Sequence, residues 1–187
     1  MSKATSCKDA IKAWAAKTGQ KPEEAEIIKL FYQFPPIERM DASLSTLKGC
    51  VHLSLSSNNI DRIAGLNSLP NLKILSLGRN LIKRIEGLDG VKDTLEQLWI
   101  SYNMIEKLGP LISLKRLRCL FIGNNLIASF GEVERLAELP DLQELVLIGN
   151  PLHQQHASTG NWRREVVRRL PGLKKLDGLP VTDDDRE

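Results

Sequence analysis

One pattern, repeated five times along the middle of the chain, limits what this sequence can fold into. Each copy reads apolar-x-x-apolar-x-apolar-x-x-Asn-x-apolar, and the first runs from Cys50 to Ile60. The asparagines of the five copies are Asn58, Asn80, Asn103, Asn125 and Asn150. Their spacings are 22 (58 to 80), 23 (80 to 103), 22 (103 to 125) and 25 (125 to 150) residues. Such a period is typical of a solenoid, in which each copy packs against its neighbours.

Within each copy, the order of apolar residues is that of the leucine-rich repeat. Leu53 and Leu55 alternate with serines, which predicts a short strand with one buried face. No copy can bury its leucines alone, so stacking should align the strands side by side. The predicted fold class is α/β: a leucine-rich-repeat solenoid of short (22-23 residue) repeats with a concave parallel sheet and helical N-terminal and C-terminal caps. Short repeats leave room only for 3₁₀ turns opposite the sheet. The last spacing, from Asn125 to Asn150, is longer and allows a helical turn at 131–139.

The five asparagines are interpreted as a structural ladder rather than as ligand-binding residues. Each one follows the end of a predicted strand, where the backbone turns inside the stack and water cannot reach its polar groups. A side-chain amide both donates and accepts hydrogen bonds, so it can satisfy backbone groups at such a turn.

The chain is long enough for one domain, which we divide into three parts. Residues 1-24 are predicted to form an N-terminal helical cap, in which Ser6 begins a helix and Gly19 ends it. Residues 25-152 hold the repeats, a degenerate first one and then five regular ones. Residues 153-187 form a C-terminal cap with a basic helix and an acidic tail.

Two details of these parts are also predicted. In the degenerate first repeat, Pro35 is expected in the asparagine slot, and the apolar slots are assigned to Ile27, Leu30, Tyr32, Ile37 and Met40. In the C-terminal cap, Asn161 is expected to cap a helix that ends before Pro171. The apolar side chains expected to face the last repeat are Trp162, Val166, Val167 and Leu170.

The concave face is the candidate functional site. Because the inward leucines determine the parity of each strand, the residues between and just after them should point outward. In the first two repeats these are small or polar, and Arg79 among them is a candidate protein-binding residue. The last three repeats place a contiguous apolar group there: Trp99, Tyr102, Phe121, Val146 and Ile148. Exposed aromatic groups of this kind usually anchor a protein partner, and the alternative is that a cap or loop covers them.

Motifs of catalysis and of metal binding are missing from the sequence. It has no phosphate-binding loop, no Gly-x-Ser-x-Gly elbow and no Cys-x-x-Cys pair. His153 and His156 are three residues apart, but we expect them in a polar loop without further ligands. We therefore predict no enzyme activity, no cofactor and no metal site.

The cysteines, the apolar runs and the net charge limit the expected cellular location of the protein and the classes of its partners. Three cysteines without paired spacing, Cys7, Cys50 and Cys119, indicate a reducing compartment. No apolar run is long enough to cross a bilayer, and the N-terminus lacks a signal-peptide core. A net charge of +3 gives no argument for nucleic acid. We expect a protein of the cytoplasm or the cytoskeleton, monomeric in isolation, with neither membrane nor nucleic acid as partner.

Charge is uneven only near the C-terminus, where basic residues precede an acidic end. Arg164, Arg168 and Lys175 are candidates for an electrostatic contact with an acidic partner. The other interpretation is a solvated helix face followed by a frayed acidic tail, Asp183 to Glu187.

Four segments stand out from the general repeat pattern: residues 35–43 (PPIERMDAS), 74–80 (ILSLGRN), 93–103 (DTLEQLWISYN) and 169–178 (RLPGLKKLDG). They resemble the leucine-rich-repeat light chain of axonemal outer-arm dynein. The resemblance runs from Lys3 to about Val181 and is poorer at 131–134 and 153–160. Every short-repeat protein shares the leucine and asparagine slots, whereas the Pro-Pro-Ile-Glu-Arg-Met-Asp and Leu-Trp-Ile-Ser-Tyr-Asn segments are specific.

This resemblance implies a non-catalytic subunit of a ciliary or flagellar motor, located in the axoneme. It implies that the sheet face binds the microtubule-binding tip of the dynein heavy-chain stalk and regulates the motor. The family's apolar patch corresponds here to Trp99, Tyr102, Phe121, Val146 and Ile148, and tubulin is a further candidate partner. Two alternatives use the same repeat: a regulatory subunit of a protein phosphatase, and a protein-binding subunit of the spliceosome.

Overall fold

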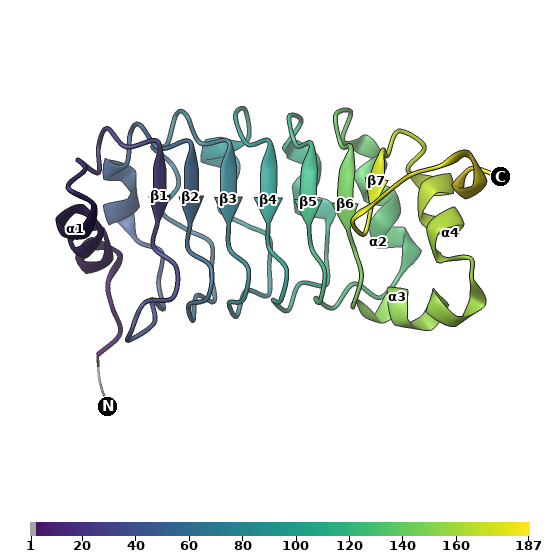
Figure 1. Cartoon of the computed structure of the whole chain (residues 1–187), viewed down its shortest axis with the longest axis horizontal. Coiled ribbons are helices and arrows are strands. Elements are labelled where there is room, and N and C mark those ends of the chain that lie inside the picture. Colours follow the sequence, from purple (N-terminus) through teal and green to yellow (C-terminus); the bar gives the residue numbers. More distant parts are fainter. Residues whose placement is uncertain (1–2) are drawn as a thin grey trace.

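The computed structural model, described for residues 3–187, is a solenoid whose strands follow one another in sequence order (Figure 1). Residues 1 and 2 of the predicted N-terminal cap lie outside this range. The strands are β1 (Ile27–Lys29), β2 (His52–Ser54), β3 (Ile74–Ser76), β4 (Gln97–Trp99), β5 (Cys119–Phe121), β6 (Glu144–Val146), β7 (Lys175–Leu176) and β8 (Leu179–Pro180). Strands β1 to β7 pair in parallel, and β8 returns antiparallel to β7. The predicted parallel sheet is confirmed.

The core is a ladder of inward side chains that the strand register aligns. Leu53 of β2 pairs with Leu75 of β3, and Leu75 with Leu98 of β4, so that equivalent leucines stack from repeat to repeat. Leu176 of β7 continues this ladder beside Leu145 and is fully buried. One continuous apolar core therefore runs the length of the solenoid.

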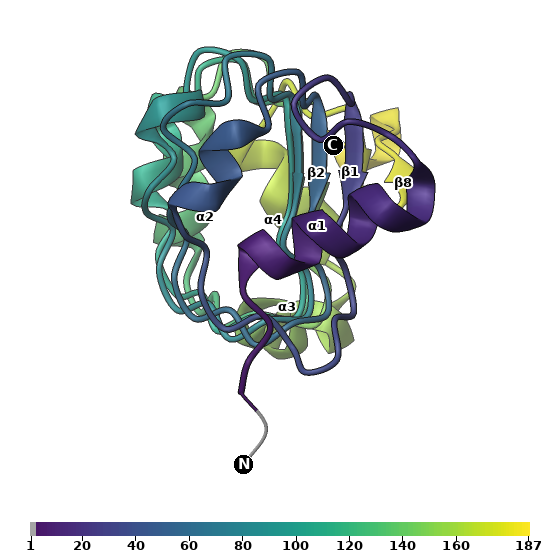
Figure 2. The same cartoon turned by 90° about the vertical axis from the view of Figure 1, so that its left-hand side faces the viewer.

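The wall opposite the sheet consists of turns and short helices (Figure 2). The 3₁₀ pieces there are η1 (Ala42–Thr46), η2 (Asp89–Val91), η3 (Gly109–Ser113) and η4 (Leu136–Glu138). The long last step also contains the helix α2 (Phe130–Arg135). Both expectations for this wall are confirmed, because a repeat of 22 or 23 residues has no length for a full helix.

Helix α1 (Cys7–Thr18) closes the N-terminal end of the core. The Ser6 hydroxyl accepts a hydrogen bond from the Asp9 N–H, and Gly19 ends the helix with a left-handed φ of 69°. Cys7, Ala10 and Ile11 are buried against the first repeat. The predicted start and end of this helix are both confirmed.

In the first repeat, Leu30, Ile37 and Met40 are buried as predicted, but the strand lies two residues earlier than the pattern predicted. Ile28 pairs with Leu53, where the pattern placed Leu30, and the side chain of Ile27 is 56% exposed. Tyr32 is exposed too, and its N–H donates to Ser56 O, which places Gln33 rather than Pro35 in the asparagine slot. Ile37 follows Gln33 by four positions, whereas Ile60 follows Asn58 by two, and these two extra residues hid the slot from simple spacing.

The C-terminal cap consists of α3 (Pro151–His156), η5 (Ala157–Thr159), α4 (Trp162–Arg169) and η6 (Asp183–Asp185). Trp162, Val166 and Val167 are buried as predicted. Asn161 stands at the N-cap position of α4, but its side chain makes no capping hydrogen bond, so that expectation is wrong. The tail is not frayed, because η6 has a capping box between Thr182 and Asp185.

Candidate functional site

The outward residues of the middle strands form one row across the concave face. Trp99 of β4 pairs with Phe121 of β5, and Phe121 pairs with Val146 of β6. The rings of Trp99 and Phe121 stack, with centroids 5.8 Å apart and planes 15° from parallel. Parallel pairing holds neighbouring strands ~4.8 Å apart, so side chains in one row must touch. The sheet thus presents a continuous apolar strip.

A second outward row was overlooked in the sequence. His52, Ile74, Gln97, Cys119 and Glu144 precede the inward leucines and have the same parity as Trp99, so they form a row next to that of Trp99. The His52 ring meets the Trp99 ring edge-on at 5.4 Å, and the Trp99 indole Nε1 donates to Gln97 Oε1 at 3.2 Å. The same alternation that identified Trp99 could have identified this row. Its polar side chains orient the indole from one side.

Arg79 and Tyr102 extend the strip toward the turns. Each precedes a ladder asparagine and has a left-handed φ, 55° for Arg79 and 59° for Tyr102. The Arg79 guanidinium lies 4.1 Å from the centre of the Tyr102 ring, a cation–π contact that sequence spacing did not reveal. A shallow hollow of about 330 Å³ opens between this pair and the Trp99–Phe121 stack, with Gly78 as part of its lining.

The side chains of this apolar strip and its extension are partly accessible to solvent. Tyr102 and Ile148 are 47% and 46% exposed, and Trp99, Phe121 and Val146 are half-buried. Within residues 3–187, no cap or loop covers these side chains, so the alternative of a hidden patch is wrong. We call this group, Trp99, Tyr102, Phe121, Val146 and Ile148 with Arg79, the concave patch.

The pKa values of two residues beside the concave patch are shifted. Burial, followed by the positive charge of Lys29, lowers the pKa of His52, which favours a neutral imidazole next to Trp99. Burial, followed by the charge of Glu144, raises the pKa of the Cys119 thiol. The other two thiols are buried in the core, where desolvation raises the pKa of Cys7 to about 11 and that of Cys50 to about 12.

The five asparagines sit behind the patch and make the hydrogen bonds of a structural ladder. Asn103 is typical: its Nδ2 donates to Leu77 O at 3.0 Å and to Ile100 O at 3.1 Å, and its Oδ1 accepts from Ile82 N at 2.9 Å. The same pattern recurs along the stack, at Asn58, Asn80, Asn125 and Asn150. Each amide ties one repeat to the previous one.

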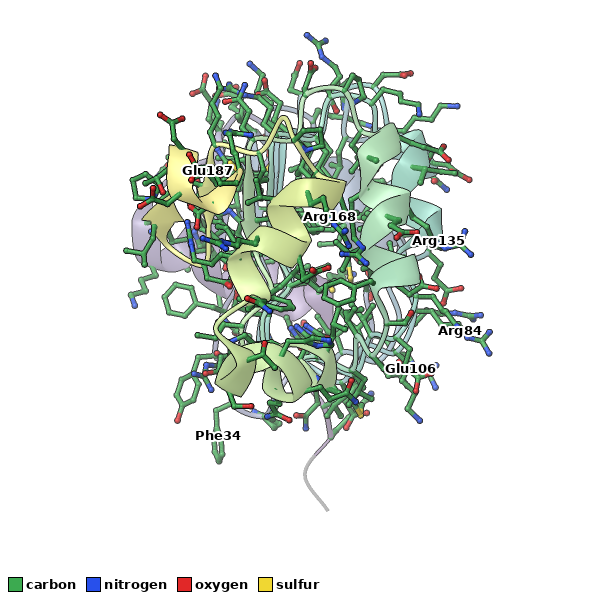
Figure 3. The ribbon with its side chains drawn as sticks, turned by 90° about the vertical axis from the view of Figure 1, so that its right-hand side faces the viewer. Phe34, Arg84, Glu106, Arg135, Arg168 and Glu187 are labelled. Atoms are coloured by element: carbon green, nitrogen blue, oxygen red, sulfur yellow. The ribbon has the colours of Figure 1, made fainter. Side chains whose placement is uncertain are left out.

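The three basic candidates at the C-terminal end differ in their surroundings. Arg168, labelled in Figure 3, is exposed and pairs with Glu165 at 2.8 Å. Lys175 pairs with Glu144 at 3.4 Å. Arg164 is exposed, and within residues 3–187 it has no ion pair. Arg163, which was not a candidate, binds the acidic tail through Asp185 at 2.9 Å. Part of the acidic end is therefore neutralised inside the cap.

The search for other kinds of site yields little. His153 and His156 lie on α3 rather than in a loop: Gly149 N donates to His153 Nδ1, and His156 Nδ1 bonds Leu152 O. Residues 3–187 contain no cluster of three or more His, Cys, Asp and Glu residues that could hold a metal ion. In the same range, no helix has both the length and the apolar character needed to span a bilayer.

Comparison with protein families identifies the repeats. Residues 48–90 and 93–135 each match the family model described as "Leucine Rich repeats (2 copies)". Among solved structures, an internalin C2 from Listeria monocytogenes superposes with a TM-score of 0.58 at 28% identity, over 72% of this chain and 54% of that one. A chain of the Drosophila melanogaster SNF/U2A′ complex superposes with a TM-score of 0.61 at 21% identity, over 71% and 75%. The second likeness shows the fold alone.

Whole-chain comparison finds much closer relatives. Dynein axonemal light chain 1 of Rattus norvegicus is 57% identical over 187 residues, which is all of this chain and 98% of the relative. The protein of the same name from Homo sapiens is 56% identical, with the same coverage. That of Chlamydomonas reinhardtii is 54% identical over all of this chain and 96% of the relative. The similarity therefore includes both caps as well as the repeats.

Proposed function

The chain belongs to the dynein axonemal light chain 1 family of leucine-rich-repeat proteins, and we propose that it is a non-catalytic light chain that binds a dynein heavy chain through the concave patch. The proposed target is the microtubule-binding tip of the heavy-chain stalk. Bound there, the light chain would regulate how the motor grips the axonemal microtubule. The proposed location is the axoneme of a cilium or flagellum.

The observation that carries this proposal is the Trp99–Phe121 stack in the open concave sheet. Two aromatic rings stacked at 5.8 Å offer a flat apolar surface, and Tyr102 and Ile148 extend it with nearly half of each side chain in solvent. Their positions are set by six parallel strand pairings and by buried asparagines, so a partner would find the surface already ordered. Aromatic anchors in a preformed surface are typical of binding hot spots.

A second, electrostatic contact is proposed for the C-terminal cap. Arg164 is the strongest of the three candidates, because Arg168 and Lys175 each have a carboxylate partner already. Exposed arginines on α4 would attract an acidic surface of the heavy chain or of tubulin. Such charges mainly raise the rate of association and contribute less to the lifetime of the complex.

The test is binding to a recombinant heavy-chain stalk that carries its microtubule-binding tip, measured by titration calorimetry. Trp99→Ala and Phe121→Ala should each weaken binding by about 2 kcal/mol or more, which is roughly 30-fold. Leu126→Ala is the matched control, because Leu126 is 42% exposed but lies outside the concave patch. Its affinity should equal that of the wild type.

The melting temperature of each variant separates lost contacts from lost folding. Both aromatic side chains are half-buried, so a modest decrease in stability is expected, far smaller than the loss of affinity. If the double variant binds the stalk as well as Leu126→Ala does, the interface lies elsewhere. If neither variant nor wild type binds the stalk, the heavy-chain proposal is wrong, and capture of a phosphatase or a spliceosomal protein would favour one of the alternatives.

A further inference from the structure

A separate groove lies at the N-terminal end of the solenoid, between α1 and β1. It encloses about 600 Å³ and is three strands away from the Trp99–Phe121 stack. In Figure 2, α1 crosses the end of the sheet and its C-terminal half projects past β1. The side chains that matter for the argument come from both walls: Ala13, Trp14, Lys17, Ile27, Lys29 and Phe31.

The backbone edge of β1 is open along this groove. β1 is the first strand of the sheet and has β2 as its single strand partner. Leu30 N donates to Ser54 O at 2.8 Å and Tyr32 N to Ser56 O at 3.1 Å, both across the β1–β2 side. Alternate residues of a strand point their N–H groups to opposite edges, so those of Lys29 and Phe31 face away from β2. Within residues 3–187, neither N–H has a hydrogen-bond partner on that side.

The walls of the groove are unusually apolar for a surface. Ile27, the first residue of β1, is 56% exposed, and Phe31, two residues after the strand, is 50% exposed. Trp14 packs its inner side on the core and shows the rest in the groove. Phe34, just beyond, is 96% exposed and points away from the body of the protein (Figure 3). An open edge with apolar neighbours is a ready template for one more strand.

The positive charge of the groove favours one kind of segment as a partner for the free edge of β1. Its only charged lining residues are Lys17 and Lys29, and within residues 3–187 neither one takes part in an ion pair. Two copies of this chain paired edge to edge would bring these lysines together, and opposed like charges destabilise a strand pair. A segment with carboxylates would instead neutralise them.

We propose that this groove binds an extended acidic segment of a partner protein, which adds a strand to the free edge of β1. Alternate side chains of an added strand point to opposite faces. Lys29 and Phe31 point to the same face of β1, so carboxylates on that face of the added strand can lie near Lys29, while apolar side chains on its other face can cover Trp14. The backbone supplies affinity and the lysines supply the preference for acidic sequences, as in other cases of strand addition. This site is independent of the concave patch.

The probe is a short peptide of alternating glutamate and valine, titrated into the full-length protein and followed by amide NMR. We expect the largest shifts at the amides of Lys29 and Phe31 and at the Trp14 indole. The matched peptide of alternating lysine and valine should bind at least about tenfold more weakly at low salt. The glutamate peptide N-methylated at alternate nitrogens cannot pair with β1 and should lose its binding.

Two variants sharpen the test. Lys17→Glu combined with Lys29→Glu should reverse the preference, so that the lysine peptide binds more tightly than the glutamate peptide. Trp99→Ala should leave glutamate-peptide binding unchanged, which separates this site from the proposed heavy-chain contact. Melting curves confirm that both variants fold.

Several results would overturn the proposal. Equal affinity for the glutamate and lysine peptides would show that charge does not determine the preference. Full binding of the N-methylated peptide would show that the peptide does not add a strand to β1. Shifts centred on Trp99 would place the peptide on the concave patch instead. A dimer in sedimentation experiments that Phe31→Asp converts to monomer would make this edge a contact between two copies of the chain.

Discussion

The indole of Trp162 donates a hydrogen bond from Nε1 to Oδ2 of Asp177 at 2.8 Å, and this contact locks the C-terminal helix to the end of the sheet. The other carboxylate oxygen of Asp177 accepts from Leu147 N at 2.7 Å and from Ile148 N at 3.0 Å. One side chain therefore connects α4 with the backbone that carries Ile148, a member of the concave patch.

Asp177→Ala should lower the free energy of unfolding by about 2 to 4 kcal/mol, because three donors lose a charged acceptor. Asp177→Asn should cost less, since an amide oxygen can still accept from Leu147 and Ile148. Asp184→Ala, at an exposed acidic position of the tail, is the control and should be neutral. Chemical denaturation measures all three, and equal midpoints would show that Asp177 does not hold the cap.

Asn150→Ser tests the asparagine ladder where it meets the C-terminal cap. Asn150 is fully buried, and its Nδ2 lies 2.9 Å from both Ile122 O and Leu147 O. A serine cannot reach these carbonyls, so we expect a loss of about 1 to 3 kcal/mol in stability. Asn59→Ser, at an exposed position, should change the unfolding midpoint little. Heavy-chain affinity of the folded Asn150 variant should fall less than its stability.

The acidic tail should make the cap sensitive to low pH. Hydrogen bonding to Arg163 lowers the pKa of Asp185 from 3.8 to about 2. A carboxyl whose pKa is lower in the folded state stabilises that state above its unfolded pKa, and this contribution is lost as pH falls toward the folded value. Unfolding midpoints of wild type and Asp185→Asn should therefore differ at pH 6 and converge between about pH 4 and pH 2. A constant difference over that range would contradict the pairing.

Cys119 provides a chemical reporter of the concave face. It is the one cysteine of the three that is not fully buried, and it lies in the row beside Trp99. Its raised pKa keeps the thiol protonated near pH 7, so alkylation should be slow there and faster as pH rises. Mass spectrometry should find the label on Cys119 before Cys7 or Cys50. Bound heavy-chain stalk should protect it, and unchanged labelling in a saturated complex would place the interface elsewhere.

The basic helix is tested by charge reversal. Arg164→Glu together with Arg168→Glu should leave the fold intact, because both side chains point to solvent. Association with the stalk should slow, and the wild-type rate should itself fall as salt rises, since exposed charges are screened over about 10 Å at 0.1 M. Lys92→Glu, another exposed reversal, controls for net charge. Equal association rates at low salt would leave α4 with a structural role alone.

The sequence alone was sufficient to predict the position of a residue wherever that position recurs from repeat to repeat. The inward leucines, the asparagine ladder and the row from Trp99 to Val146 follow from one pattern, because equivalent residues in stacked repeats must lie side by side. The N-terminal helix followed from its local signals, Ser6 and Gly19, whose effect depends on the backbone next to them. These features together predicted that Trp99, Phe121 and Val146 share one face of the sheet, as they do in the structure.

Only the tertiary structure decided the contacts that do not recur. The register of β1 differs from the regular spacing by two residues, and only its pairing with β2 shows which of its residues face the core. The contacts Arg79–Tyr102, Arg163–Asp185 and Trp162–Asp177 join side chains through turns and caps that occur once each. In a repeated pattern, each residue lies beside the equivalent residue of the next repeat, so its neighbours can be read from the sequence. A contact that occurs once depends on the whole path of the chain between its two residues.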